Sequence, residues 1–121
     1  MRINYSIVFV SDMKLSVAFY RDVVGMPLKF ETPEWTEFAT EGATFALHTA
    51  KGPGTNESIE QKSSAGRCRP GWSVPDLEAF HQKMVEKGVE CVEEPKETFG
   101  VKLAQYLDPD GLLVSVSEER Q

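Results

Sequence analysis

The spacing of apolar residues changes along the chain, and each change predicts a new element of secondary structure. Residues 3–10 are rich in β-branched and aromatic side chains, which is typical of a strand. Ser11 then provides a cap for a helix, and Gly25 supplies the left-handed residue that ends it. Between them, apolar residues recur every three or four positions, as in an amphipathic helix; they are Met13, Val17, Tyr20 and Val24.

Three short strand-like runs follow this helix, at residues 28–31, 35–40 and 43–49. Glu41 and Gly42 form the expected tight turn between the last two runs. The periodicity is then lost, and glycine, proline and polar residues dominate as far as Gly66. A linker or mobile loop is therefore expected at residues 50–66.

The same order of elements then starts again with a strand at residues 67–74. A helix opens at Pro75-Asp76 and ends at Gly88, and three more strands are expected at residues 89–93, 101–107 and 112–118. The two helix starts, Val10-Ser11-Asp12-Met13 and Val74-Pro75-Asp76-Leu77, match at a shift of 64 residues. The chain is therefore predicted to be a single α+β domain, residues 1–121. Two tandem βαβββ modules, residues 1–49 and 67–121, form a curved sheet around a cavity.

Composition narrows the range of partners. The formal net charge of −6 disfavours nucleic acid, whose phosphates require a basic surface. No apolar run approaches the roughly 20 residues that span a bilayer, so no membrane segment is expected. The first residues lack the features of a signal peptide, and a cytoplasmic location is expected. Cys68 and Cys91 are accordingly expected to be reduced.

Three stretches of the sequence carry a resemblance to a known family. They are residues 10–26, residues 72–89 and the turn Asp108-Pro109-Asp110-Gly111 before the last strand. Together they resemble the vicinal oxygen chelate superfamily, which contains glyoxalase I, bleomycin-resistance and fosfomycin-resistance proteins, and extradiol dioxygenases. The resemblance covers nearly the whole chain and implies the fold given above and a homodimer. It does not select an activity, because the superfamily contains both metalloenzymes and binding proteins.

The resemblance also implies four positions at which family enzymes bind a divalent metal with His and Glu side chains. In this chain these positions hold Tyr5, Ala46, Arg69 and Ser115. Alanine has no donor atom, and the permanent cation of arginine repels a metal ion. No metal cofactor is therefore expected. A displaced site stays open as an alternative, because His48 lies on the same side of its strand as Ala46 and Glu37 lies on the neighbouring strand.

Strand alternation predicts which side chains face the cavity and which face the helices. The candidate ligand-binding residues are Tyr5, Phe9, Trp35, Glu37, His48, Arg69, Ser73 and Ser115. Aromatic rings, hydroxyls, an imidazole and a guanidinium suit a flat organic molecule that carries an anionic or carbonyl oxygen. The core is expected from helix-facing residues, among them Phe45, Leu47, Val114 and Val116. His81, on the second helix, is expected to be a solvated residue at the helix edge.

The sequence thus predicts a glyoxalase/bleomycin-resistance-like protein that lacks the usual metal ligands. It binds a small organic molecule and sequesters a drug or metabolite. The alternative is a lyase or isomerase of glyoxalase type that uses His48 as its catalytic residue, with or without a displaced divalent metal. An interaction protein without a ligand fits less well, unless Arg69 is paired with an acidic residue such as Glu37.

Overall fold

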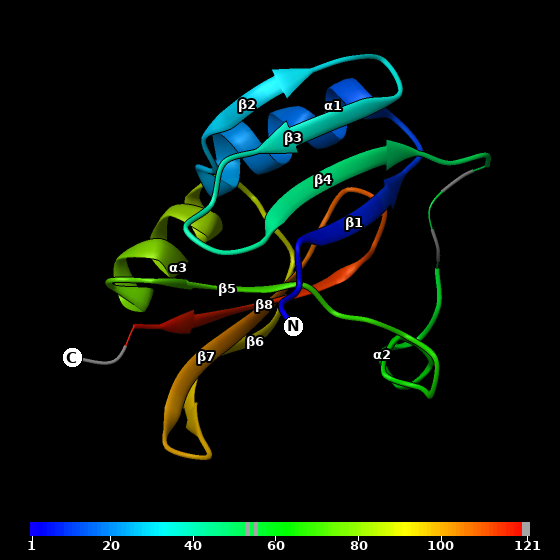
Figure 1. Cartoon of the computed structure of the whole chain (residues 1–121). Helices are drawn as coiled ribbons and strands as arrows, with labels where there is room; N and C mark the ends of the chain where they lie inside the picture. The colour runs from blue at the N-terminus through cyan, green and yellow to red at the C-terminus, as the bar shows by residue number, and fades with distance from the viewer. Residues whose placement is uncertain (53, 55, 120–121) are drawn as a thin grey trace. The chain divides into compact units, whose positions relative to one another are not determined.

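The computed structural model describes residues 1–52, 54 and 56–119. Positions 53 and 55 of the expected linker and positions 120–121 of the second module lie outside the described residues. The chain divides into two units, Met1–Gly54 and Thr55–Gln121. Each unit contains an open four-stranded sheet with a helix packed on one face, which confirms the predicted α+β class and the repeat (Figure 1).

Unit 1 follows the predicted order of elements. They are β1 (Tyr5–Val10), α1 (Met13–Ala18), the π-helical segment η1 (Phe19–Val24), β2 (Leu28–Glu31), β3 (Trp35–Phe38) and β4 (Thr44–Thr49). The strands are arranged in the order β1-β4-β3-β2. The first and last strands of the unit, β1 and β4, run parallel to each other, while the β4–β3 and β3–β2 pairs are antiparallel.

Unit 2 repeats this topology after a short additional helix. Its elements are α2 (Ile59–Lys62), β5 (Gly71–Val74), α3 (Leu77–Glu86), β6 (Cys91–Thr98), β7 (Val101–Leu107) and β8 (Leu113–Glu118). The strand order is β5-β8-β7-β6, with β5 parallel to β8. No helix in the described part of either unit combines the length and apolar character that a bilayer crossing requires.

The core of each unit lies between its sheet and its helix. The predicted helix-facing residues are all buried; Phe45 is 5% exposed, and Leu47, Val114 and Val116 are 0% exposed. In unit 1 they pack with residues from β1, α1 and η1, including Val8, Val10, Val17 and Tyr20. In unit 2 the helix contributes Leu77 and Met84. Burial of these apolar side chains is the main force that holds each helix on its sheet.

Both helices begin at an aspartate, and the predicted Ser11 cap is wrong by one residue. The Asp12 carboxylate accepts a hydrogen bond from the Leu15 N–H at 3.0 Å, and the Asp76 carboxylate accepts one from the Ala79 N–H at 3.1 Å. A carboxylate at this position satisfies a free N–H group and also interacts favourably with the positive end of the helix dipole. Pro75 accordingly precedes the cap instead of occupying the first turn.

The π-helical segment η1 explains a length difference between the repeats. Gly25 lies thirteen positions after Asp12, whereas Gly88 lies twelve positions after Asp76. The wider turns of a π-helix take up an additional residue without moving the helix ends. Both glycines adopt positive φ values, 95° at Gly25 and 74° at Gly88, so the predicted left-handed stop is present in both units.

The segment expected to be a linker contains the short helix α2. Ser58 caps it reciprocally: the Ser58 N–H donates to Gln61 Oε1 at 2.8 Å, and the Gln61 N–H donates to Ser58 Oγ at 3.2 Å. This capping box was the sequence signal for the helix. It was missed because four residues are too few to show an apolar period. Ile59 is 40% exposed, so the helix does not contribute a large side chain to the core.

The turn between β6 and β7 generates a stability prediction. Phe99 and Gly100 connect paired residues Thr98 and Val101, with φ values of 52° and 76°. Asparagine adopts this left-handed conformation far more readily than a bulky side chain, and the Phe99 ring is fully exposed. Phe99→Asn should therefore raise the free energy of unfolding by about 1 kcal/mol in urea denaturation. Phe99→Leu should give no comparable gain; equal stabilisation by both variants would contradict a conformational origin.

Candidate functional site

The face of the unit 1 sheet opposite the helix carries exposed apolar side chains. They belong to β1, the same strand that contributes Val8 and Val10 to the core. Val8 and Val10 of β1 are buried, whereas Tyr5, Ile7 and Phe9 are 54%, 45% and 63% exposed. This alternation follows from the two-residue period of a strand whose other face is covered by a helix. β1 therefore presents two rings and one branched aliphatic side chain on its uncovered side.

The neighbouring strands place two more rings beside those of β1. In the sheet register His48 of β4 lies between Phe9 of β1 and Trp35 of β3. The ring centroids of Phe9 and His48 are 5.5 Å apart, those of Trp35 and His48 are 5.9 Å apart, and those of Tyr5 and Trp35 are 6.4 Å apart. We call the set Tyr5, Phe9, Trp35 and His48 the aromatic face.

Polar groups with defined hydrogen-bonding roles adjoin these rings. The Trp35 indole N–H donates to Glu37 Oε2 at 2.9 Å, and the Lys29 ammonium lies 3.7 Å from Glu37 Oε1. His48 Nδ1 lies 2.6 Å from the Thr49 carbonyl oxygen. A carbonyl oxygen can only accept, so Nδ1 carries the proton and Nε2 of the neutral ring is left as an acceptor. The face thus offers an imidazole acceptor and a carboxylate.

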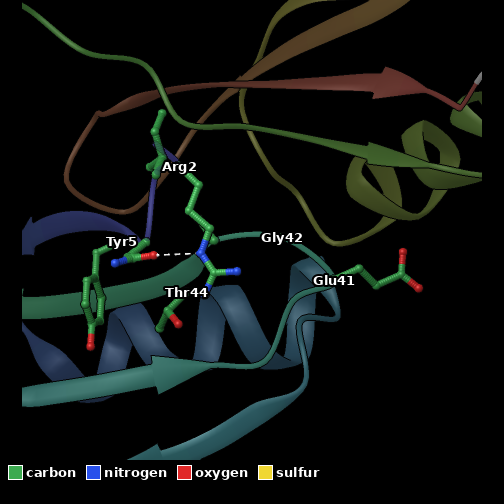
Figure 2. A pocket seen from close by; sticks show the side chains of 8 residues that line it. Arg2, Tyr5, Glu41, Gly42 and Thr44 are labelled. Carbon is green, nitrogen blue, oxygen red and sulfur yellow. Dashed lines mark hydrogen bonds between the residues drawn. The ribbon is translucent and has the colours of Figure 1, made fainter.

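A pocket of about 520 Å³ lies at the start of β1 (Figure 2). Tyr5 belongs both to this pocket and to the aromatic face. Arg2 Nε donates to Asn4 Oδ1 at 3.2 Å, and Figure 2 shows the guanidinium reaching toward Thr44 while Glu41 points away. Sequence reasoning missed Arg2, because its only signal was a positive charge just before the first strand of an acidic chain.

Ser73 and Ser115 lie together in unit 2. They line a pocket of about 300 Å³ with Gly71, Trp72, Leu103 and Ser117. Gly71 of β5 is opposite Ser115 of β8 in the parallel pair, and Ser73 is opposite Ser117. This serine pocket offers hydroxyl groups on a small-residue surface.

Arg69 is not on a strand, and the expected strand at residues 67–74 begins only at Gly71. Pro70 has no N–H to donate to a sheet ladder, although its carbonyl accepts the Ser115 N–H at 3.0 Å. Arg69 instead lines a different pocket and donates to Ser63 Oγ at 2.7 Å. The structure therefore brings Tyr5, Phe9, Trp35, Glu37 and His48 together in unit 1, and Ser73 and Ser115 together in unit 2.

His81 is not the solvated helix-edge residue expected from the sequence. It is half-buried, and its Nδ1 lies 2.9 Å from the hydroxyl oxygen of Tyr106 on β7. Tyr106 is fully buried, and this burial raises the pKa of its phenol above the ordinary range. Tyr106 therefore keeps its proton, and its hydroxyl donates to His81 Nδ1 or accepts from it according to the tautomer of the imidazole. The pair lies between α3 and the sheet of unit 2, so its role is structural.

This buried phenol predicts a specific loss of stability in alkali. The phenol ionises near its ordinary pKa of 10 in the unfolded chain but stays protonated in the folded chain. The free energy of unfolding should therefore fall above about pH 10, by up to about 1.4 kcal/mol per pH unit from this group. Urea denaturation of wild type and Tyr106→Phe between neutral pH and pH 11 measures it. The variant should lose this component; identical pH dependence in both proteins would contradict it.

The described residues contain no cluster of three or more His, Cys, Asp or Glu side chains placed to hold a metal ion. At the positions that the resemblance implies for metal ligands, Ala46 is 0% exposed and Arg69 is hydrogen-bonded to Ser63. Of the displaced pair considered from the sequence, Glu37 accepts the Trp35 indole N–H, whereas His48 binds the Thr49 carbonyl through Nδ1 and keeps its Nε2 lone pair.

The sequence of this chain is similar to those of other proteins over most of its length. Residues 2–116 match the model of the Glyoxalase/Bleomycin resistance protein/Dioxygenase superfamily. The uncharacterized protein YraH of Bacillus subtilis (strain 168) is 26% identical over 115 residues, which cover 88% of this chain and 90% of that protein.

Solved structures share the fold over nearly the full length. A protein of unknown function from Agrobacterium tumefaciens str. C58 is 27% identical with a TM-score of 0.77, covering 99% of this chain and 95% of that one. TnmS3, an antibiotic binding protein from Streptomyces sp. CB03234, is 24% identical with a TM-score of 0.72, covering 99% of this chain and 97% of that one. At these identities the structures establish the architecture, and function has to be argued from the site.

Proposed function

We propose that this chain, which belongs to the Glyoxalase/Bleomycin resistance protein/Dioxygenase superfamily, binds a small, flat organic molecule on the aromatic face. It sequesters this molecule without a divalent metal. The main observation behind this proposal is the exposure of aromatic rings on that face, 54% for Tyr5 and 63% for Phe9. Large apolar side chains gathered on one surface mark a binding site, because their burial by a partner is favourable.

The arrangement of the rings supports an aromatic ligand. Trp35 meets both Tyr5 and His48 edge to face, at interplanar angles of 65° and 82°. Such a cluster is held by its own ring contacts, and its exposed surfaces can stack on a further ring. A preformed cluster also reduces the side-chain entropy that binding would otherwise remove.

The polar groups beside the rings select the ligand further. His48 Nε2 and the Glu37 carboxylate accept hydrogen bonds, which suits a hydroxyl or amino group on the ligand. The Arg2 guanidinium lines the same pocket as Tyr5 and suits an anionic or carbonyl oxygen. The proposed ligand is therefore an aromatic molecule with oxygen or nitrogen substituents.

Sequestration is supported by analogy with a binding protein that has the same fold. TnmS3 is an antibiotic binding protein with the same architecture, so this fold is compatible with holding an organic molecule. A homodimer, which the family resemblance implies, is part of the proposal, and light scattering measures it directly.

Binding without a metal is supported by the chemistry of the available donors. Ala46 has no donor atom, the Ser115 hydroxyl is neutral, and Arg69 is a permanent cation. Such a set does not match the imidazole and carboxylate ligands that hold divalent metals in proteins. The proposed mode of binding therefore uses stacking and hydrogen bonds alone.

A second candidate, an enzyme that uses His48, is favoured by one observation. The bond from Nδ1 to the Thr49 carbonyl leaves the Nε2 lone pair on an exposed ring, where it could accept a proton. The two candidates differ in outcome, because a binder returns its ligand unchanged. Mass spectrometry of a ligand after prolonged incubation with the protein distinguishes them.

Dye binding tests the proposed site. The probe is 8-anilinonaphthalene-1-sulfonate, an aromatic anion whose fluorescence rises on apolar surfaces. Phe9→Ala should weaken its binding by about tenfold or more, since losing the burial of one ring costs at least about 1.5 kcal/mol. Leu15→Ala is the matched control, because Leu15 is 56% exposed on α1, on the helix side of the sheet. Equal dye binding by wild type and Phe9→Ala, with both proteins folded, would contradict the site.

Metal content tests the proposed mode of binding. Protein purified without chelator should contain less than about 0.1 equivalent of zinc, nickel, iron, manganese or cobalt by elemental analysis, because its donor set does not compete for these ions. EDTA should leave dye affinity unchanged. Stoichiometric metal whose removal abolishes ligand binding would contradict the proposal and favour the enzyme candidate.

A further inference from the structure

A small pocket in unit 2 is unusually rich in positive charge for an acidic chain. It has a volume of about 190 Å³ and is lined by Lys62, Ser63, Ser64, Arg67, Cys68 and Arg69. Three of these six side chains are cationic, although the formal net charge of the chain is −6. We call it the basic pocket, and we propose that it binds a phosphate group. It shares no residue with the aromatic face.

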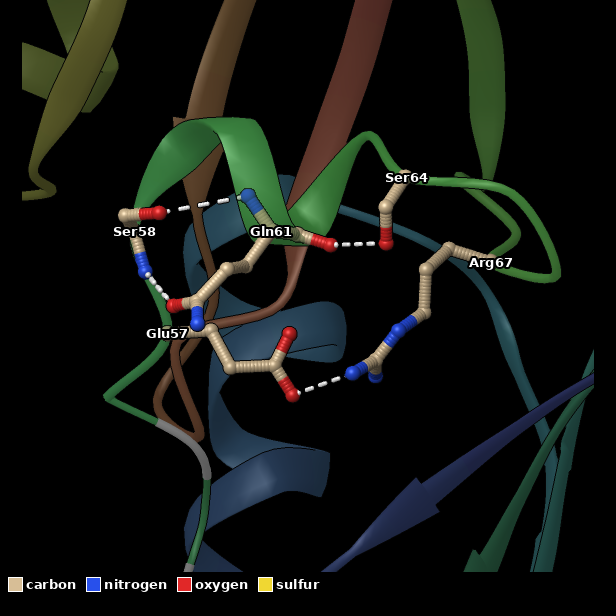
Figure 3. Close-up of polar contacts among 5 residues, drawn as sticks. All are labelled: Glu57, Ser58, Gln61, Ser64 and Arg67. Carbon is tan, nitrogen blue, oxygen red and sulfur yellow. Dashed lines mark hydrogen bonds and ion pairs between the residues drawn. The ribbon is translucent and has the colours of Figure 1, made fainter.

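Two of the three cations lack an acidic partner. Arg67 is paired with Glu57 at 2.5 Å, as Figure 3 shows. Neither Lys62 nor Arg69 lies within ion-pair distance of a carboxylate anywhere in the described ranges, 1–52, 54 and 56–119. Two uncompensated positive charges in one pocket attract an anion.

The Lys62 ammonium is the strongest single indication. Its nitrogen is buried, and it has no hydrogen-bond partner among the residues that the structure describes. Burying an ammonium group without a partner is costly, and an anion in the pocket would supply the missing acceptor.

The remaining groups hold the donors in place. Arg69 donates to Ser63 Oγ at 2.7 Å, which leaves the Ser63 hydroxyl hydrogen available to an acceptor. Ser64 Oγ donates to the Gln61 carbonyl at 2.7 Å, and the Ser58–Gln61 capping box secures the other end of α2 (Figure 3). The guanidinium and hydroxyls are therefore positioned before any ligand arrives, which reduces the entropy lost on binding.

Pocket size and charge together select the ligand class. Sites for drug-sized molecules have volumes of roughly 300–1,000 Å³, which is larger than the 190 Å³ found here. A phosphate group is compact, carries up to two negative charges, and accepts hydrogen bonds in several directions at once. Ammonium, guanidinium and hydroxyl donors in one pocket match these properties. The same chemistry is presented by inorganic phosphate and by the terminal group of an organic phosphate monoester.

Calorimetric titration of the full chain with inorganic phosphate and with methyl phosphate, at constant ionic strength, tests the site. Lys62→Met and Arg69→Met should each weaken binding by about ten- to a hundred-fold, because each removes a charge-assisted hydrogen bond. Lys83→Met is the matched control: Lys83 is exposed on α3, and the variant removes one positive charge outside the pocket. Arg69→Lys, which keeps the charge, should retain part of the affinity.

Saturable binding of either probe that depends on Lys62 and Arg69 supports the site, and the tighter probe identifies the source of the phosphate group. Wild type that shows no saturable binding in the millimolar range would overturn the proposal. An equal loss of affinity in Lys83→Met would overturn it as well, by showing that net charge and not the pocket is responsible. Circular dichroism and dye binding should be unchanged in Lys62→Met, so a folding defect or a failure of the aromatic face is recognised separately.

Discussion

Each unit has one long helix packed on a four-stranded sheet, and within the described part of that unit the other face of the sheet has no helix. This constraint determines which side chains form the core and which form the candidate site. The helix can bury only one face, so a single strand has to satisfy two environments. In β1, Val8 and Val10 pack toward the helix, while Tyr5 and Phe9 stay exposed. The two-residue period of the strand thus fixes the core residues and the exposed rings together. A shift of β1 by one residue would bury the rings and expose the valines.

The same framework carries different surfaces in the two units. An aspartate cap, a left-handed glycine and a parallel pairing of first and last strands occur in both. The positions opposite the helix differ: the exposed Phe9 of β1 corresponds to Ser73 of β5, and the fully buried Ala46 of β4 corresponds to Ser115 of β8. Unit 1 thus presents rings and unit 2 presents hydroxyls. Since exposed residues such as Phe9 contribute little to the core, their chemistry can vary while the fold is kept.

The features that the sequence predicted correctly are those that follow from a repeated period. Alternation identified Phe45, Leu47, Val114 and Val116 as core, and it predicted that Tyr5, Phe9 and His48 share one face of the unit 1 sheet. The features it missed depend on single residues or on distant contacts. Pro70 moved Arg69 off the strand, and a four-residue helix arose from the Ser58–Gln61 capping box. His81 found its partner in Tyr106, twenty-five positions away, which no local pattern encodes.

The two tryptophans allow the most direct test of ligand binding by the aromatic face. Trp35 lies in unit 1 with its indole N–H bonded to Glu37, and Trp72 lines the serine pocket of unit 2. Their indole N–H resonances can be followed separately in a nitrogen–proton NMR spectrum during titration with a flat aromatic ligand. The Trp35 resonance should shift in a saturable manner while that of Trp72 moves much less. A saturable shift confined to Trp72, with Trp35 unaffected, would contradict binding at the aromatic face.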